Sequence, residues 1–476
     1  MCSFILTNIK LNSALIQYVN EYLKYRGPDV TNVKEIGGYT FIHNLLHITG
    51  EMIIQPFIKN DIVCLFNGEI YNYENFGDYK SDGECLIDLY EKIGDDFLKK
   101  LDGEFSICIL DFKQKKIIFA RDIFGTKPLY YNIDNSNISF STYKSPLDIL
   151  ECKTIKEVNN NTIYNYDIMN NKLEAKILHH FDFSNQYKTT YEDWEKAFLN
   201  SIKKRISNKN RKKFICLSSG YDSGCICLAA NLLNEDYKTF TINAREDLNI
   251  IKARHLKNDK ELFQIMLTKS LYSNALQKLN KIIEPILYYS KTEIYTKNSL
   301  IFPPAQYSSD MYISEDKASV GLSYICDIAS DEGYRIFLSG QGADEIYADY
   351  GFNGRDSGGG HSRFGGRWPS NMLSKINGKK FISNDVNDDV IWDSFFKSPQ
   401  RNYIMKEDCV SGAHGIEGRF PYLDKDVVQE FLWLDVKLKN QEYKGPLGFF
   451  LEKYKYPYSK NTKIGFKADY GFNKNL

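Results

Sequence analysis

Cys2 stands out chemically because it directly follows Met1. If Met1 is removed, Cys2 carries a thiol and a free α-amine. An unperturbed α-amine has a pKa of about 7.7–8.0, so it can accept the thiol proton near neutral pH. Cys2 would then supply both nucleophile and base for attack on a carbonyl carbon. The oxyanion of such a reaction needs donors, which the Asn67 amide and the Gly68 N–H can provide. By itself, Asn-Gly is also typical of a plain hairpin turn.

A second candidate site lies where an apolar strand expected at Lys213–Leu217 meets a helix expected at Ser223–Leu233. The turn between them consists of Ser218, Ser219, Gly220, Tyr221, Asp222 and Ser223. A short Ser/Gly turn at a helix N-terminus presents backbone N–H groups and the positive end of the helix dipole to an anion. Asp222 would repel a bare phosphate, so its presence implies an intervening cation, most simply Mg²⁺.

The elements expected before residue 150 are short apolar strands separated by turn signals. Strands are expected at Asp61–Phe66, Phe105–Asp111 and Lys116–Ala120, and turns at Asn67–Gly68, Asp82–Gly83 and Asp102–Gly103. Helical periodicity appears at Ser13–Lys24 and Glu84–Ile93. Together they predict a β-rich sandwich with helices.

The pattern changes from strands to alternating helices and strands near residue 191. Residues 150–190 are polar and β-like, and either close the first domain or bridge to a second one. The elements expected next are helix Tyr191–Ser207, the strand and helix around Ser218–Ser223, strand Tyr237–Asn243 and, later, strand Arg335–Leu338. This rhythm predicts a parallel α/β sheet. The glycine-rich segment 351–368 is expected to be a loop.

Length and composition exclude several classes of protein. The chain has 476 residues, which predicts two domains. Its net charge is zero, so nothing suggests binding to nucleic acid or to an anionic membrane. No signal peptide and no apolar run long enough to span a membrane is visible. The ten cysteines have irregular spacing, which favours buried reduced thiols and a cytoplasmic location.

Six segments of the N-terminal part occur in a characteristic order. They are MCSF at the start, Arg26–Asp29 (RGPD), Asn67–Asn72 (NGEIYN), Ser81–Glu84 (SDGE), Leu101–Phe105 (LDGEF) and Arg121–Leu129 (RDIFGTKPL). This combination resembles the glutaminase domain of class II glutamine amidotransferases, and of asparagine synthetases in particular. Six ordered motifs are far more specific than a single glycine motif.

The resemblance implies roles for individual residues. Cys2 would be the nucleophile, and Asn67 and Gly68 the oxyanion hole. Glu69 and Asp82, with Asn67, would bind glutamine, the two carboxylates holding its α-amine. In the sequence HNLLHI (residues 43–48), however, Leu45 stands where the family has an arginine that pairs with the substrate α-carboxylate. Leucine cannot bind a carboxylate, so another cation substitutes or glutamine binds weakly.

The segments of the C-terminal part are similar to the ATP pyrophosphatase half of the same family. Ser218–Ser223 resembles its SGGxDS pyrophosphate loop, with Ser219 in place of a glycine. SGQGADE at residues 339–345 resembles SGEGxDE, which adds Ser339, Gly340, Gln341 and Gly342 to the expected ATP site. Asp344 would be the second Mg²⁺ ligand, paired with Asp222 across adjacent strand ends. Gln341 cannot act as a general base, so the base of the amide-forming step stays unassigned.

Two further segments carry the resemblance toward the C-terminus. Gly415–Asp424 (GIEGRFPYLD) resembles the family pattern G-x-E-x-R-x-P-F-L-D, in which Glu417 and Arg419 would form an ion pair. Lys463, in the sequence KIGF, corresponds to a lysine that meets the phosphates.

The resemblance covers nearly the whole chain and implies its organisation. It predicts an Ntn-hydrolase-type αββα sandwich as the glutaminase domain (residues 1–180), followed by a parallel-sheet α/β synthetase domain like the adenine nucleotide α-hydrolases (residues 190–476). The implied function is glutamine-dependent amidation of an ATP-adenylated aspartate, with a homodimer left open. Three alternatives remain: another carboxylate as acceptor, including ring closure; an ammonia-only synthetase; and a paralogue that only binds nucleotide.

Overall fold

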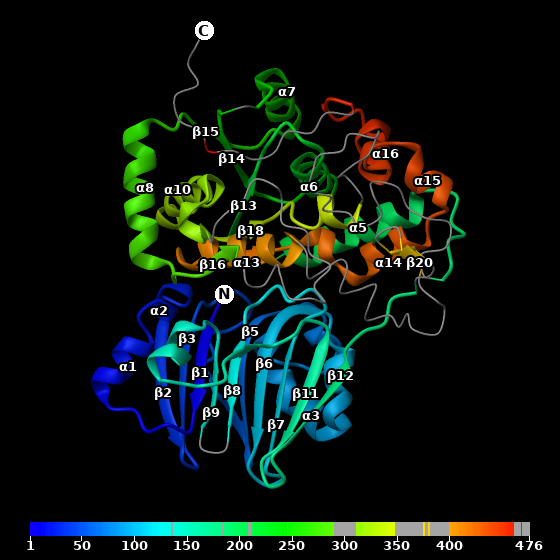
Figure 1. Cartoon of the computed structure of the whole chain (residues 1–476). Coiled ribbons are helices and arrows are strands. Elements are labelled where there is room, and N and C mark those ends of the chain that lie inside the picture. The colour runs from blue at the N-terminus through cyan, green and yellow to red at the C-terminus, as the bar shows by residue number, and fades with distance from the viewer. Residues whose placement is uncertain are drawn as a thin grey trace. The chain divides into compact units, whose positions relative to one another are not determined.

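The strands of the N-terminal part form two antiparallel sheets of six strands each (Figure 1). The computed structural model describes residues 1–289, 311–347 and 399–460 except 135–136, 183, 208–210 and 245, together with residues 375–376, 379–380 and 468. Its contacts divide the chain into unit 1 (residues 1–179, 282–284 and 408–417) and unit 2 (the remainder).

Unit 1 has the layered arrangement αββα. One sheet has the order β10-β8-β9-β1-β3-β2 and the other β12-β11-β7-β6-β5-β4. The first contains Lys156–Glu157, Tyr130–Ile133, Ile138–Ser141, Ser3–Thr7, Tyr39–Leu45 and Val30–Ile36; the second contains Lys172–Ile177, Thr162–Asp167, Lys116–Arg121, Gly103–Asp111, Ile62–Ile70 and Phe57–Lys59. The helices are α1 (Ser13–Val19), α2 (Leu23–Arg26), α3 (Cys85–Ile93) and α4 (Ser145–Ile149), with 3₁₀ turns at Tyr73–Asn75, Asp82–Glu84 and Gly94–Lys100. The expected sandwich is confirmed, and the polar segment after residue 150 completes both sheets.

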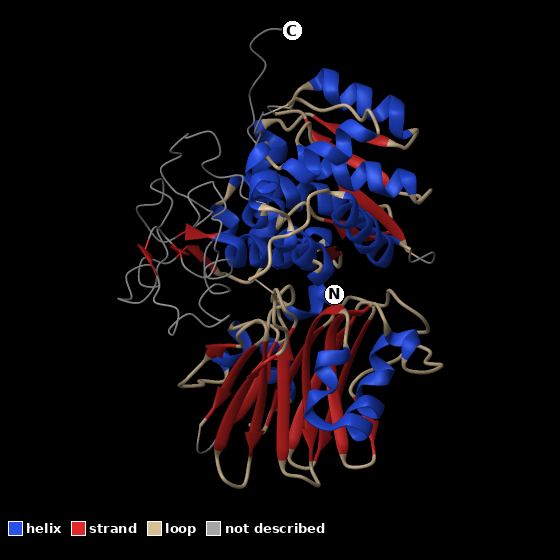
Figure 2. Ribbon diagram, turned by 90° about the vertical axis from the view of Figure 1, so that its right-hand side faces the viewer, coloured by secondary structure: helices blue, strands red, loops and turns tan. Residues whose placement is uncertain are grey.

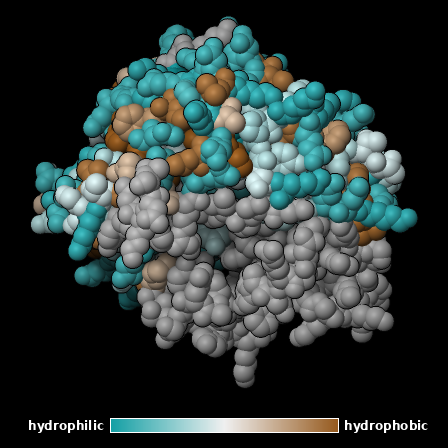
Figure 3. Space-filling model, turned by 90° about the horizontal axis from the view of Figure 1, so that it is seen from above, coloured by the Kyte–Doolittle hydropathy of each residue, from teal (hydrophilic) through white to brown (hydrophobic). Residues whose placement is uncertain are grey.

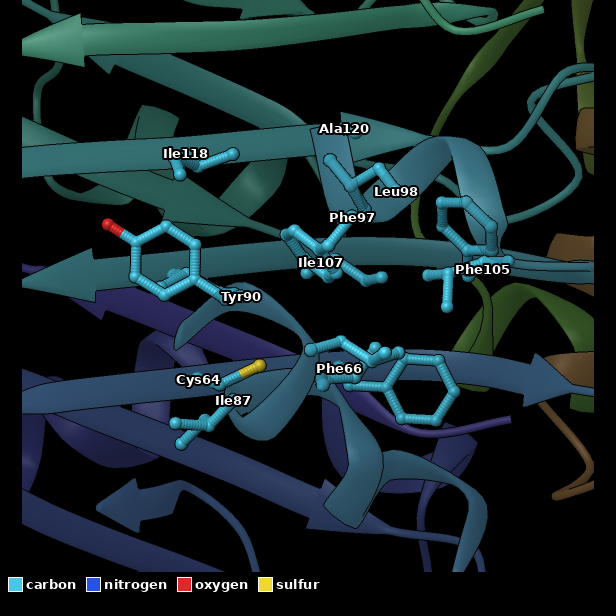
Figure 4. Close-up of a cluster of buried hydrophobic side chains, with 14 of the residues drawn as sticks. Cys64, Phe66, Ile87, Tyr90, Phe97, Leu98, Phe105, Ile107, Ile118 and Ala120 are labelled. Carbon is cyan, nitrogen blue, oxygen red and sulfur yellow. The ribbon is translucent and has the colours of Figure 1, made fainter. Parts of the chain in front are cut away.

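Successive side chains of β5 point to opposite faces of the sheet, as in any strand. Val63 and Leu65 pack into the core between the two sheets. Cys64 and Phe66 pack instead against α3, on the side shown in Figure 4. Because β5 is covered on both faces, its first part, Ile62–Phe66, is a continuous apolar run. Each fully buried side chain of this kind stabilises the fold by about 1.5–3 kcal/mol.

Two local predictions for unit 1 are wrong. Asn67 and Gly68 do not form a turn but continue β5, where they pair with Ser106 and Phe105 of β6. Gly68 has φ +138°, and a Cβ there would lie 2.0 Å from the carbonyl oxygen of Glu104, so the close approach of the strands requires glycine.

The helix expected at Ser13–Lys24 is also interrupted, and α1 ends at Val19. The side chain of Asn20, at the end of α1, exchanges two hydrogen bonds with Asn44 of β3, at 2.7 and 3.0 Å. Asn20 is the C-cap of α1, and the chain resumes a helix only at Leu23.

Unit 2 is built on a five-stranded sheet of order β15-β14-β13-β18-β21, in which β15, β14, β13 and β18 are parallel neighbours. These strands are Leu262–Ile265, Lys238–Ile242, Lys212–Cys216, Tyr334–Leu338 and Glu417–Arg419. Short pairs form between β16 (Leu287–Tyr289) and β17 (Met311–Tyr312), and between β19 (Lys375–Ile376) and β20 (Lys379–Lys380). The expected parallel α/β sheet is confirmed.

Helices flank this sheet (Figures 1 and 2). They are α5 (Glu192–Ile206), α6 (Tyr221–Leu232), α7 (Leu248–Asn258), α8 (Lys269–Ile282), α10 (Lys317–Asp331), α11 (Ala343–Ile346), α13 (Pro399–Gly412), α14 (Lys425–Trp433), α15 (Val436–Gln441) and α16 (Gly445–Lys453), with 3₁₀ turns at Ile313–Glu315 and Pro421–Leu423. In the view from above, the described surface is mostly hydrophilic with scattered apolar side chains (Figure 3). No helix among the described residues is long and apolar enough to cross a membrane. The glycine-rich segment 351–368 lies outside the described residues.

Candidate active sites

The thiol of Cys2 lies in a cavity of unit 1. Cys2 immediately precedes β1, and its Sγ lies 3.8 Å from the carbonyl oxygen of Leu46. The cavity is lined by residues from several segments, among them Cys2, Leu45, His47, Thr49, Gly68, Glu69, Asp82 and Glu417. Burial raises the pKa of the Cys2 thiol to about 11, although the nearby α-ammonium group opposes the shift. At neutral pH the thiol is therefore protonated, and it needs a base before it can act as a nucleophile.

Two carboxylates that line the cavity, those of Glu69 and Asp82, accept hydrogen bonds from neighbouring residues. Glu69 accepts a hydrogen bond from the hydroxyl of Thr49, and Oδ2 of Asp82 accepts one from the N–H of Ile70 at 2.9 Å. None of the described residues that line the cavity is a lysine or arginine. Leu45, at the end of β3, is one of them, so the position of the missing arginine does face this cavity. The cavity favours a positive group and offers little to a negative one.

The two residues expected to form an oxyanion hole are placed differently. Gly68 lines the cavity, whereas Asn67 is not among its lining residues. The Nδ2 of Asn67 donates to Ser106 Oγ at 3.4 Å, and its buried Oδ1 has no hydrogen-bond partner among the described residues. The structure thus brings Cys2, Gly68, Glu69 and Asp82 together and leaves the Asn67 side chain beside them.

Glu417 joins this cavity from a distant part of the sequence. Its Oε2 lies 3.5 Å from the α-amino nitrogen of Met1. Burial lowers the pKa of that α-amine below its usual 8.0, and Glu417 opposes the shift. Arg26 fixes the same region, because its Nε donates to the carbonyl oxygen of Cys2 at 3.2 Å and its Nη1 to Asp408 Oδ2 at 2.7 Å. The expected partner of Glu417, Arg419, donates to the carbonyl oxygen of Arg205 at 2.9 Å.

The loop Ser218–Ser223 joins β13 to α6 in unit 2. Ser218 and Ser223 share a hydrogen bond between their hydroxyls at 2.7 Å, and Ser219 donates from its N–H and its hydroxyl to Glu246 Oε2, both at 2.5 Å. Gly220 begins α6 without a side-chain cap, so the first turn of the helix presents its N–H groups to an external anion. The serine that replaces the family's glycine therefore tethers the loop to a neighbouring strand end.

Arg254 of α7 binds two backbone carbonyl oxygens of the same loop. Its Nη1 donates to the carbonyl oxygens of Ser218 and Gly220, at 2.5 and 2.8 Å. A Cβ on Gly224 would lie 2.4 Å from Nη2 of Arg254, so a side chain at position 224 would displace this guanidinium group.

Lys444 brings the two predicted metal ligands together. Its Nζ lies 2.6 Å from Asp222 Oδ1 and forms a second, shorter ion pair with Asp344. Asp222 lies in the first turn of α6 and Asp344 in the first turn of α11, and each helix follows one of two adjacent parallel strands. Lys444 itself has φ +48° and ψ +50°, a conformation that costs a non-glycine residue of the order of 1 kcal/mol. Such strain persists where the surrounding contacts impose it.

The loop 339–342 follows β18 and contacts a carboxylate that the motifs did not indicate. Ser339 Oγ donates to Glu407, and Gln341 Nε2 donates to Glu407 Oε1 at 2.9 Å. Gly342 has φ +95°, in the left-handed region that glycine adopts most readily. A Cβ at Gly340 would lie 3.1 Å from the Cβ of Asp222, so the two loops are in contact.

The chemistry of these donors fits Mg²⁺. The carboxylates of Asp222 and Asp344 both bind the ammonium group of Lys444, so they lie close enough to share one cation. Carboxylate oxygens are the hard ligands that Mg²⁺ prefers. No group of three or more metal-binding side chains occurs among the described residues. One or two protein carboxylates, completed by phosphate and water, is the usual arrangement for Mg²⁺ with a nucleotide.

Lys444, Glu246, Arg254 and Glu407 were missed by the sequence reasoning. The only signal near Lys444 is the Lys-Gly-Pro sequence at the start of α16, where proline typically opens a helix. The predicted phosphate-binding Lys463 lies outside the described residues.

A thiol in an αββα sandwich and an anion-binding loop on a parallel sheet define a two-part enzyme class, a glutamine amidotransferase joined to an ATP pyrophosphatase. The comparisons agree with this class. Residues 1–187 match a glutamine amidotransferase domain, and residues 193–401 and 385–468 match asparagine synthase. The chain belongs to the asparagine synthase family of glutamine-hydrolysing, ATP-dependent amide ligases.

Similar curated proteins are distant in sequence. A putative glutamine-hydrolysing asparagine synthetase 1 of Methanocaldococcus jannaschii is 25% identical over 459 residues, covering 89% of this chain and 74% of the relative. Asparagine synthetase 1 of Saccharomyces cerevisiae is 26% identical over 363 residues, covering 70% of this chain and 62% of the relative. The Bos taurus asparagine synthetase is 23% identical, with coverage of 84% and 71%.

Proposed function

We propose that this protein is a glutamine-dependent asparagine synthetase, with residues 1–180 as the glutaminase domain and residues 190–476 as the synthetase domain. The convergence of Asp222 and Asp344 on Lys444, at the ends of adjacent parallel strands, carries the proposal. Ligands bind at that edge of open α/β sheets. Homodimerisation and a cytoplasmic location stay predictions from the sequence.

In the glutaminase reaction, Cys2 acts after Met1 has been removed. Its α-amine takes the thiol proton, and the thiolate attacks the carboxamide carbon of glutamine. Glu69 and Asp82 hold the substrate α-ammonium group by charge complementarity. The Gly68 N–H and the Asn67 amide stabilise the oxyanion, for which the Asn67 side chain turns from Ser106 toward the cavity. Ammonia leaves, and water hydrolyses the thioester.

In the synthetase reaction, the loops Ser218–Ser223 and 339–342 bind the phosphates of ATP. Backbone N–H groups and the N-terminus of α6 attract the phosphate oxygens. Asp222 and Asp344 would hold Mg²⁺, which neutralises phosphate charge when it is bound. Lys444 can transfer its interaction from the carboxylates to pyrophosphate as the latter leaves, and Lys463 is proposed to assist. The aspartate carboxylate becomes an adenylate, which ammonia then converts to the amide.

An exchange assay tests the acceptor. Incorporation of labelled pyrophosphate into ATP is measured with aspartate, glutamate and a panel of other carboxylic acids. We expect exchange with aspartate; exchange with another acid and none with aspartate would refute the proposed product. The second step is followed by mass analysis with amide-¹⁵N-glutamine, which should place ¹⁵N in asparagine.

The source of nitrogen needs a separate test, because no lysine or arginine among the described residues lines the cavity to bind the glutamine carboxylate. Cys2→Ala should abolish asparagine formation from glutamine while ammonium chloride still supports it. Equal turnover of the wild type and Cys2→Ala with glutamine would show instead that the protein uses free ammonia only.

A further inference from the structure

Gln341 occupies the position at which the family motif has a glutamate, and an amide cannot accept a proton at neutral pH. The structure places a carboxylate directly on this glutamine. Glu407 of α13 accepts a hydrogen bond from Gln341 Nε2 at 2.9 Å through one oxygen and from Ser339 Oγ through the other. A carboxylate is therefore present at this loop, although the chain supplies it from a residue 66 positions away.

From this contact we infer that Glu407 is the proton acceptor of the amide-forming step. The inference rests on the proposed function, because it concerns the second half of that reaction. The loop that Glu407 contacts also touches the phosphate loop, since a Cβ at Gly340 would lie 3.1 Å from that of Asp222. Glu407 is thus hydrogen-bonded to the loop 339–342, and this loop adjoins the proposed site of adenylate formation.

The amide-forming step needs a proton acceptor. Ammonia attacks the acyl carbon of the adenylate, a C–N bond forms, and the nitrogen becomes positively charged. Unless a proton leaves, ammonia is the better leaving group and the intermediate reverts. Glu407 takes one proton, the C–O bond to AMP breaks with its electron pair on AMP, and a neutral amide remains. The carboxyl group then returns its proton to water.

The surroundings of Glu407 suit this role. Its side chain is partly buried. Burial nevertheless raises its pKa above the usual carboxyl value, while Ser339, Gln341 and the nearby Lys406 partly oppose the shift. Lys406 itself pairs with Asp316 at 3.0 Å. Among the described residues, Glu407 also interacts with the thiols of Cys216 and Cys326, which stay neutral because burial raises their pKa.

A purely positioning role for Glu407 predicts different kinetics. If Glu407 only holds the loop 339–342, its loss disturbs nucleotide binding and impairs both half-reactions. If it accepts a proton, adenylation proceeds without it, because no proton is removed from ammonia in that step. The two half-reactions therefore separate the roles.

The test compares pyrophosphate exchange with amide formation from ammonium chloride, using whichever acid supports exchange. Glu407→Gln keeps the size of the side chain and one oxygen that accepts from Gln341, while its amide nitrogen can donate to Ser339 Oγ instead of accepting from it. We therefore expect exchange within about threefold of wild type. Amide formation should fall about 10²–10⁴-fold, the usual contribution of a general base, and more ammonium should not restore it. When the rates are referred to the concentration of unprotonated ammonia, the acidic limb that remains in the wild type should be absent from Glu407→Gln.

The double variant Gln341→Glu/Glu407→Gln is the matched control, because it returns a carboxylate to the same hydrogen-bonded pair. We expect the double variant to form amide at least about tenfold faster than Glu407→Gln. The inference would be overturned if Glu407→Gln formed amide at the wild-type rate. It would also be overturned if the rates of exchange and of amide formation fell equally in the single and the double variant. Failure of wild-type exchange with aspartate would instead overturn only the proposed acceptor.

Discussion

Lys444→Met gives the most direct test of the site in unit 2. Only 2% of the Lys444 side chain is exposed, and its ammonium group neutralises two carboxylates at once. Removing one partner of a fully buried ion pair typically costs 3–5 kcal/mol. Here Asp222 and Asp344 are 27% and 18% exposed, so water screens part of their repulsion. We expect the variant to lose about 2–3 kcal/mol of unfolding free energy.

Magnesium should reverse part of this loss. In Lys444→Met the two carboxylates have no ammonium group between them, so they bind a divalent cation more tightly. At a tenfold excess over its dissociation constant, a ligand that binds only the folded state stabilises it by about 1.4 kcal/mol. In the wild type, Lys444 competes with the cation, and the gain should be smaller.

The assay is urea unfolding followed by tryptophan fluorescence, in EDTA and in MgCl₂. All four tryptophans lie after residue 190, so the signal reports the C-terminal part of the chain. Lys437→Met is the control, because Lys437 is an exposed lysine on the preceding helix α15. An unfolding midpoint for Lys444→Met equal to that of the wild type in EDTA, or the same magnesium effect in both proteins, would refute the reasoning.

Three more predictions concern unit 1. Cys2→Ser should lower glutamine hydrolysis at least about 10²-fold while leaving ammonium-dependent synthesis intact, because a hydroxyl is far harder to deprotonate; equal hydrolysis by both proteins would contradict the role of the thiol. Leu45→Arg should lower the KM for glutamine about tenfold or more, since a charged hydrogen bond contributes about 1.5–3 kcal/mol; Leu45→Met is the control, and an unchanged KM would show that the α-carboxylate binds elsewhere. Burial raises the pKa of Glu284 to about 7, from 4.5, although its hydrogen bond from Ser145 opposes this. Between pH 4.5 and 7 the folded state thus keeps a proton that the unfolded chain has released. The stabilisation by protonated Glu284 is complete below pH 4.5, and about 3 kcal/mol of the free energy of unfolding is lost as the pH rises to 7. Glu284→Gln should remove this decline in urea unfolding at pH 5 and pH 7.5, and an identical pH dependence would disprove it.

Local sequence patterns predict much of the architecture because they reflect the environment of each strand. The apolar run of β5 corresponds to burial on both faces, and the Ser/Gly turn after β13 does lie at a helix N-terminus. The turn expected at Asn67–Gly68 failed, since the same dipeptide also suits a strand that approaches its neighbour too closely for a side chain. Register with β6 decided between the two conformations.

The sequence by itself determined the kinds of chemistry: a thiol next to an α-amine, an anion-binding turn and two aspartates after two strands. Only the tertiary structure decided which charges surround them. Lys444 is 222 residues from Asp222, and Glu407 is 66 residues from Gln341. No local periodicity relates such distant positions. They meet because neighbouring parallel strands end at one edge of the sheet, where helices from later in the chain bring in their side chains.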